Sequence, residues 1–169
     1  MKGLARLEPP ARLAILCAAM LAATQGCQSG PSQSDASTAG HTALVQRWFE
    51  EGFNQRHLNV VDELFAEQVS INGQVVSRSA IKQSMSRHLS GFPDLRVTLD
   101  DTIAEGNRVD VWYTVAGTHR GEFEGVAPTG RAVMWTGVDH FRIDGDRISE
   151  ARFLSDLHGL LTQLGPRLP

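Results

Sequence analysis

The stretch Gly117–Gly130, GTHRGEFEGVAPTG, begins at the end of one segment in which apolar and polar residues alternate and leads to a second such segment. These segments, residues 109–119 and 132–143, have the period-two pattern of half-buried β-strands. The turn sequence Asp144-Gly145-Asp146 then joins the second of them to a further alternating segment, 147–156. The stretch is therefore expected to be a connection within an antiparallel meander.

The period changes at Pro93. A further strand begins after it, at Leu95, whereas apolar residues recur at helical spacing before it. We expect helices at residues 43–56, 60–65 and 79–89, a short strand at 69–71, and a short amphipathic segment at 157–164. Helices first and a meander second indicate an α+β fold, with three helices packed on one face of a curved antiparallel sheet.

The N-terminal residues 1–26 have the pattern of a signal peptide. Three basic residues, Lys2, Arg6 and Arg12, accompany the uninterrupted apolar run 13–23. That run is too short to cross a hydrocarbon core of about 30 Å as an ordinary transmembrane helix. The sequence therefore predicts export to the bacterial cell envelope.

The end of this segment, Thr24-Gln25-Gly26-Cys27, resembles a bacterial lipobox. Two outcomes remain open: lipidation of Cys27, or ordinary cleavage that leaves the protein periplasmic. Residues 27–41, rich in Ser, Gly, Gln and Ala, are expected to form a flexible tether. The folded domain would then span residues 42–165, with a tail at 166–169.

Composition excludes several classes of function. Hydrophobic residues make up 41% of the 169 residues, which is enough to bury a core. The net charge is −3 and becomes −5 without residues 1–26, which hold three basic residues and one acid. Nucleic-acid binding is therefore not expected, and membrane contact is expected only through the lipid anchor. Both cysteines lie in the first thirty residues and the histidines lack metal-ligand spacing, so no metal is expected.

The stretch 117–130 is similar to the GTHxGxFxGxxPTG signature of the SnoaL-like polyketide cyclase family, within the nuclear transport factor 2-like superfamily. Flanking segments agree: Gly91–Leu95, Gly137–Asp139 and the DLHGLLTQLG sequence of 156–165. The resemblance implies a cone-shaped α+β barrel around an apolar pocket. It also implies catalysis without a cofactor, by an aspartate in a D-x-x-G element that acts as general acid and base. Asp156 matches that aspartate.

Each candidate catalytic residue has a structural alternative. Asp156 could be a base in an apolar cavity, or it could cap the helix that follows it. His119, which matches the histidine of the GTH motif, could polarise a carbonyl or could anchor the following loop by hydrogen bonds. His140 is expected at the surface.

The expected pocket combines aromatic and charged side chains. Glu150 and Arg152 share a mixed face of the last strand, as a pocket wall would. If Arg152 pairs with Asp156, the pKa of the aspartate falls, which would favour binding of an anionic ligand; an Asp–Arg–Asp arrangement for epoxide hydrolysis is a third option. The expected pocket or core aromatics are Trp48, Phe49, Tyr113 and Trp135.

Two functions follow as hypotheses. The first is a cyclase or isomerase that acts on a small hydrophobic carbonyl compound. The second is a non-catalytic envelope lipoprotein that binds a small hydrophobic molecule or a partner. The outer sheet face, with Trp112, is a candidate surface for a homodimer.

Overall fold

The computed structural model of the protein describes residues 33–165. The expected signal peptide at 1–26, the lipidation site Cys27 and the tail at 166–169 lie outside these residues. Within 33–165, none of the helices combines the length and the apolar character that crossing a membrane requires.

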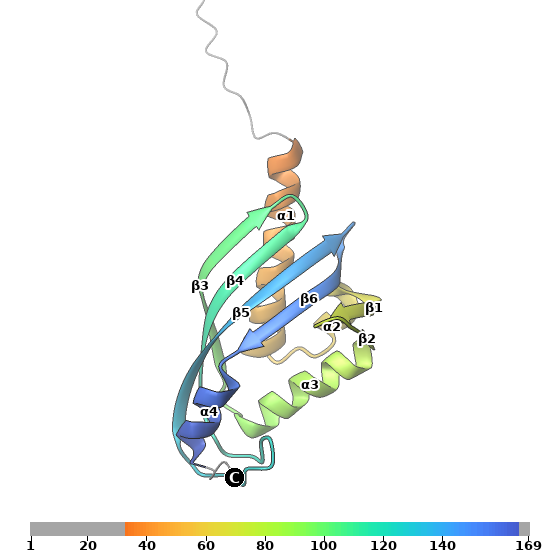
Figure 1. Ribbon diagram of the computed structural model, residues 1–169. Coiled ribbons are helices and arrows are strands. Elements are labelled where there is room, and N and C mark those ends of the chain that lie inside the picture. The colour runs from red at the N-terminus through yellow and green to blue at the C-terminus, as the bar shows by residue number, and fades with distance from the viewer. Residues whose placement is uncertain (1–32, 166–169) are drawn as a thin grey trace, which may run out of the picture. The chain divides into compact units, whose positions relative to one another are not determined.

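Six strands form one curved sheet (Figure 1). Their spatial order is β2-β1-β6-β5-β4-β3, and the last four strands of the chain form the antiparallel meander predicted from the sequence. The strands are β1 (Phe65–Ile71), β2 (Gln74–Ser77), β3 (Arg96–Glu105), β4 (Arg108–Thr118), β5 (Ala132–Asp144) and β6 (Arg147–Ser155).

The sheet is mixed, which corrects the expectation of a purely antiparallel one. β1 pairs antiparallel with β2 but parallel with β6. Asn72, in the turn between β1 and β2, fixes this pairing: its side-chain oxygen accepts from the backbone N–H of Phe153 at 2.9 Å. Sequence periodicity identifies a strand but not its partner, and β2, four residues long with Val75 exposed, has no alternating pattern to detect.

The helices cover one face of this sheet (Figure 1). The first helix begins at Gln33, so residues 33–41, expected to be part of a flexible tether, are helical. The helix is held by tertiary contact, because His41 Nδ1 lies 2.8 Å from the carbonyl oxygen of Gly106 in the β3–β4 turn. The helices are α1 (Gln33–Arg47), the π-helical η1 (Trp48–Asn54), α2 (Val60–Leu64), α3 (Arg78–Gly91) and α4 (Leu157–Leu164).

Aromatic side chains join the helices to the sheet. Trp48 and Phe49, at the start of η1, are almost fully buried. The Trp48 ring contacts the Phe65 ring edge-on at a centroid distance of 4.9 Å, and the Phe49 ring contacts Phe141 edge-on at 6.1 Å. Such edge-to-face pairs add directional packing to the burial of apolar area. The aromatic residues of η1 therefore face the inner side of the sheet.

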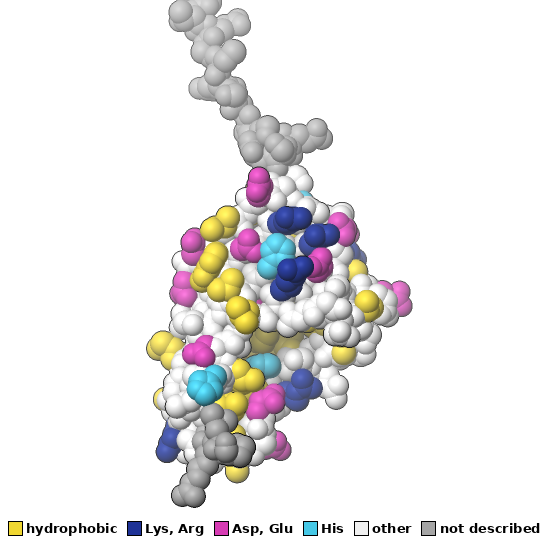
Figure 2. Space-filling view, viewed as in Figure 1, with side chains coloured by type: hydrophobic (Ala, Val, Ile, Leu, Met, Phe, Trp, Pro, Cys, Tyr) yellow, Lys and Arg dark blue, Asp and Glu magenta, His cyan; other side chains and the backbone are white. Residues whose placement is uncertain are grey.

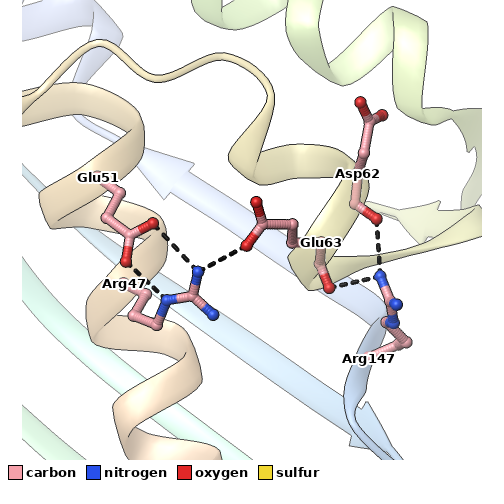
Figure 3. A network of polar contacts seen from close by, with 5 residues as sticks. All are labelled: Arg47, Glu51, Asp62, Glu63 and Arg147. Carbon is pink, nitrogen blue, oxygen red and sulfur yellow. Dashed lines mark hydrogen bonds and ion pairs between the residues drawn. The ribbon is translucent and has the colours of Figure 1, made fainter.

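Two arginines hold the short helix α2 in place (Figure 3). Arg47 binds Glu51 at 2.6 Å and Glu63 at 2.8 Å, which links α1 to η1 and α2. Arg147 at the start of β6 donates to the backbone carbonyls of Asp62 and Glu63. The carbonyls at the end of α2 are thereby satisfied, and the short helix is held against the sheet.

The opposite face of the sheet is exposed. Figure 2 shows hydrophobic side chains gathered on this face beside a cluster of basic ones. The apolar residues include Trp112, which is 42% exposed, and Leu154, which is 73% exposed. His140 lies on the same face, where its Nδ1 is 2.5 Å from Asp110 Oδ1. A homodimer formed through this face stays a prediction.

Candidate active site

A cavity of about 340 Å³ lies between the helices and the inner face of the sheet. In Figure 2 a recess between β6 and α3 exposes hydrophobic side chains. Its lining is mainly apolar, as is usual for small-molecule sites. The aromatic residues that line it are Trp48, Phe49, Phe53, Tyr113, Trp135 and Phe153. The sequence-predicted Trp48, Phe49, Tyr113 and Trp135 thus all lie on the cavity wall.

Asp139, near the middle of β5, is the carboxyl group of this cavity. It is 4% exposed, and the hydroxyl of Tyr113 donates to its Oδ1 at 3.1 Å. The backbone N–H of Leu154 also donates to it. No ion pair of residues 33–165 involves Asp139. Burial raises the pKa of Asp139 to about 7, and the two hydrogen bonds only partly offset this effect.

Gly137 makes the contact between Tyr113 and Asp139 possible. It lies directly opposite Tyr113 in the β4–β5 register, two residues before Asp139. A Cβ atom at position 137 would collide with the hydroxyl and the ring of Tyr113. The Tyr113 ring therefore lies across β5 where a side chain would otherwise stand, and its hydroxyl reaches the carboxylate. Burial beside Asp139 raises the pKa of Tyr113, so the phenol stays a neutral donor.

Asp156 lies elsewhere, at the exposed N-terminus of α4. Its Oδ1 accepts a hydrogen bond from the backbone N–H of Gly159 at 2.8 Å. It is not among the residues that line the cavity. Of the two roles that the sequence left open for Asp156, this geometry is that of the helix cap: the side chain satisfies a backbone donor that the first turn of the helix leaves free, and it is not sheltered in apolar surroundings.

His119 is buried but also lies outside the cavity lining. The backbone N–H of Thr129 donates to its Nδ1 at 3.2 Å, so the ring holds the two ends of the 119–130 connection together. Its Nε2 is the one fully buried side-chain nitrogen or oxygen of residues 33–165 that has no hydrogen-bond partner. Desolvation lowers the pKa of His119. The geometry is that of a loop anchor.

Glu150 and Arg152 lie on the outer face of the sheet, which corrects their assignment to the pocket. Arg152 is 70% exposed and pairs with Glu150 at 3.2 Å rather than with Asp156. The reason is a register shift in the β5–β6 pairing between Arg142 and Ile143. This irregularity inverts the alternation, so Ile148 points inward while Glu150 points outward. The Asp–Arg–Asp arrangement for epoxide hydrolysis is therefore not assembled from Arg152 and Asp156.

Asp139 was not predicted from the sequence as a site residue, although a signal was present. Residues 133, 135, 137, 139, 141 and 143 of β5 all face inward. Asp139 is the only ionisable residue among them, because the others are Val, Trp, Gly, Phe and Ile. An acid in the middle of an inward-facing strand pattern is therefore the signal that would have found it.

The rest of the polar lining is sparse. Ser84 and His88 on α3 and Ser155 at the end of β6 border the cavity. Within residues 33–165, no group of three or more His, Cys, Asp or Glu side chains is arranged to hold a metal ion. The polar groups that the cavity does contain can transfer protons and form hydrogen bonds between mainly apolar walls.

Comparison with known proteins places this arrangement in context. A family model described as SnoaL-like polyketide cyclase matches residues 43–164. A search of curated proteins finds no match.

Solved structures with the same fold are numerous. AclR from Streptomyces galilaeus, for which a hydroxylase function has been suggested, is 29% identical with a TM-score of 0.69, and the match covers 79% of this chain and 100% of AclR. IdmH from Streptomyces antibioticus, suggested to be a polyketide cyclase, is 28% identical with a TM-score of 0.66, over 75% of this chain and 99% of IdmH. A SnoaL-like protein from Jannaschia sp. CCS1 shares the fold at 24% identity and a TM-score of 0.70, over 79% of this chain and 96% of its own.

Proposed function

The chain belongs to the SnoaL-like polyketide cyclase family, and from this premise we propose that it is a cofactor-independent cyclase or isomerase of a small hydrophobic carbonyl compound. Asp139 is the general acid and base in this proposal. The observation that supports it is a single buried carboxyl group, with its pKa raised to about 7, in a mainly apolar cavity. A base with a pKa near the working pH is well suited to both accept and return a proton.

The proposed reaction begins with the carboxylate form of Asp139. The carboxylate takes a proton from the carbon next to the substrate carbonyl; the electron pair of that C–H bond then delocalises onto the carbonyl oxygen as an enolate. In an isomerase, the carboxylic acid returns the proton to a different carbon. In a cyclase, the enolate carbon attacks a second carbonyl of the same molecule, and Asp139 returns the proton to the resulting alkoxide.

Tyr113 and the aromatic walls support this role. The Tyr113 hydroxyl donates to Asp139 at 3.1 Å, which orients the carboxylate toward one side of the cavity. The apolar lining keeps the dielectric constant low, so the negative charge of the carboxylate is poorly solvated before reaction. Transfer of the proton neutralises this buried charge. IdmH, similar to this chain, is itself suggested to be a polyketide cyclase.

A second candidate function is non-catalytic binding of a small hydrophobic molecule. One observation favours it: Asp156, which matches the family's catalytic aspartate, is exposed and caps α4. In this case the cavity would hold a ligand, and Asp139 would serve only as a hydrogen-bonding group.

We also propose that the domain acts in the bacterial cell envelope, either attached through a lipid on Cys27 or periplasmic. The apolar run and the lipobox-like sequence support this proposal. Metabolic labelling of the expressed full chain with a fatty-acid analogue tests it, with Cys27→Ser as the control. Label on the wild-type chain that is lost in Cys27→Ser supports the anchor; wild-type chain recovered unlabelled from the periplasm supports ordinary cleavage.

Hydrogen–deuterium exchange separates the two candidate functions. 2-Tetralone is a bicyclic ketone with an acidic C–H next to its carbonyl, and its exchange in D₂O is followed by NMR. We expect the wild-type protein to accelerate this exchange and Asp139→Asn not to. Binding of 2-tetralone without accelerated exchange would contradict catalysis and favour the binding function.

A further inference from the structure

The cavity contains an ionisable side chain, His88, that the proposed proton transfer does not use. His88 lies on α3, in the helical layer, whereas Asp139 lies on β5, in the sheet. Both residues line the same cavity. The cavity therefore has ionisable groups on both walls: Asp139 and Tyr113 on the sheet, and His88 on the helical layer.

The hydrogen bond of His88 defines which nitrogen of its ring is free to accept. Its Nδ1 lies 3.0 Å from the backbone carbonyl oxygen of Ser84, one turn earlier in α3. A carbonyl oxygen only accepts, so Nδ1 carries the proton. In the neutral ring, Nε2 is then an acceptor with a free lone pair. Among residues 33–165, His119 alone has a fully buried side-chain nitrogen without a partner, so Nε2 of His88 is not sealed within protein atoms.

The surroundings of His88 keep the ring neutral and fixed. Burial lowers the pKa of His88. The hydrogen bond to the Ser84 carbonyl opposes this effect only in part, and the smaller effects of Arg87 and Glu124 act in opposite directions. The Phe123 ring packs on the imidazole at a centroid distance of 5.1 Å. The hydrogen bond to Ser84 and the contact with Phe123 together restrict the ring. His88 is therefore a preorganised acceptor rather than a mobile charged group.

We propose that His88 is a specificity-determining residue, whose Nε2 accepts a hydrogen bond from a hydroxyl group on the substrate. The substrate class is then an apolar carbonyl compound that also has a hydroxyl group remote from the carbonyl. This inference rests on the proposed function in one respect: the carbonyl end of the substrate is placed at Asp139 because of the role proposed for that residue. The lone pair of His88 loses water when a ligand fills the cavity, so a ligand without a donor there leaves an acceptor unsatisfied.

Three bicyclic ketones test this inference. They are 2-tetralone, 6-hydroxy-2-tetralone and 6-methoxy-2-tetralone, which differ only at a position on the ring remote from the carbonyl. Their dissociation constants are measured by titration against the fluorescence of Trp48 and Trp135, which line the cavity. We expect the wild-type protein to bind the hydroxy compound about 3- to 10-fold more tightly than either other compound, the range of one net hydrogen bond.

Variants show whether this preference depends on His88. His88→Leu should reduce it to less than about 2-fold, whereas His88→Gln, whose amide oxygen can accept, should retain part of it. The matched control is His158→Leu, at an exposed position of α4, which should keep the full preference. Equal binding of the three ketones by the wild-type protein, including no binding of any, would overturn the proposal even if His88→Leu failed to fold. An unchanged preference in His88→Leu would overturn it as well.

The same assay distinguishes failure of this inference from failure of the proposed function. Asp139→Asn should abolish exchange of 2-tetralone but keep the preference for the hydroxy compound, since the two groups lie on opposite walls. A hydroxyl preference without any exchange by the wild-type protein would contradict catalysis and still support the role of His88. Exchange of 2-tetralone without a preference for the hydroxy compound would support catalysis and would overturn the role of His88.

Discussion

Two aspartates of this chain, Asp139 and Asp156, have the same side chain and opposite environments. Asp139 is 4% exposed, and its hydrogen-bond donors are one phenol and one backbone N–H. Asp156 is exposed, and it accepts from the first turn of α4. Burial raises the pKa of Asp139 to about 7, so the first carboxyl is a potential acid and base at neutral pH.

The comparison shows that a motif position and a chemical environment can separate. Asp156 is the aspartate that the sequence resemblance indicated, whereas Asp139 has the desolvated surroundings that proton transfer requires. The position of Asp156 explains its role as a cap. Leu157, the next residue, begins the amphipathic helix α4, whose first backbone N–H groups need an acceptor.

The largest expected effect is on catalysis. Asp139→Asn removes the proton acceptor but keeps an oxygen that accepts from Tyr113, so exchange of 2-tetralone should fall by about 10²- to 10⁴-fold. Asp156→Asn keeps a good helix cap and should stay within about 2-fold of the wild-type rate. The opposite result, with Asp156→Asn inactive and Asp139→Asn active, would show that Asp156 and not Asp139 is the catalytic residue.

The second prediction concerns pH. Catalysis by the carboxylate form should rise with pH through a midpoint of about 7. Stability should change in the opposite direction, because the fold favours the protonated form of Asp139. Its contribution is complete below about pH 4, the ordinary range of an unfolded aspartate, and is lost as pH rises to about 7.

Denaturant titration of Asp139→Asn measures this linkage. At pH 8 the variant should be more stable than the wild type by on the order of 3 kcal/mol, because it has no buried charge to desolvate. At pH 4.5 the difference should be much smaller. A stability difference that does not change between these pH values would mean that the pKa of Asp139 is ordinary.

A smaller effect is expected at Gly137. Gly137→Ala places a methyl group where the Tyr113 ring lies, so the ring must move or β4 and β5 must separate. We expect a loss of about 1–3 kcal/mol in the free energy of unfolding, typical of overpacking. The exchange rate should also fall, since Tyr113 no longer orients Asp139. Tyr113→Phe is the matched control, because it removes the hydroxyl without the collision.

The smallest effect is expected at the helix cap. Asp156→Ala should lower the free energy of unfolding by about 1 kcal/mol, whereas Asp156→Asn should change it little, because asparagine caps as well as aspartate. Chemical denaturation of both variants measures the difference. Equal loss in the two variants would show that the negative charge, and not the capping hydrogen bond, stabilises α4.

Much of the fold could be predicted from sequence patterns that are local. The strands of the meander and the helices before Pro93 follow from alternation and helical spacing. The parallel β1–β6 pairing could not be predicted in this way, because it depends on segments far apart in the chain. The helical start of α1 was missed for a related reason, since His41 is held by the carbonyl of Gly106 in a distant turn.

The site was predicted less well, and the errors have physical causes. Aromatic residues of η1 and β4 line the cavity because large apolar side chains face inward. Glu150 and Arg152 were misplaced because the register shift in β6 breaks the strict alternation on which the assignment relied. Asp139 was missed because its inward direction becomes meaningful only once the neighbouring inward residues of β5 are considered together.

The place of β1 beside β6 has a consequence for synthesis of the chain. Asn72 and Phe153, which join these strands, are 81 residues apart, and a ribosome makes β1 long before its neighbour. Until β6 emerges, β1 and β2 can form only a two-stranded hairpin, which is marginal in water. A nascent chain that stops short of β6 therefore lacks the strand between β1 and β5, and with it the part of the cavity that Phe153 and Ser155 line.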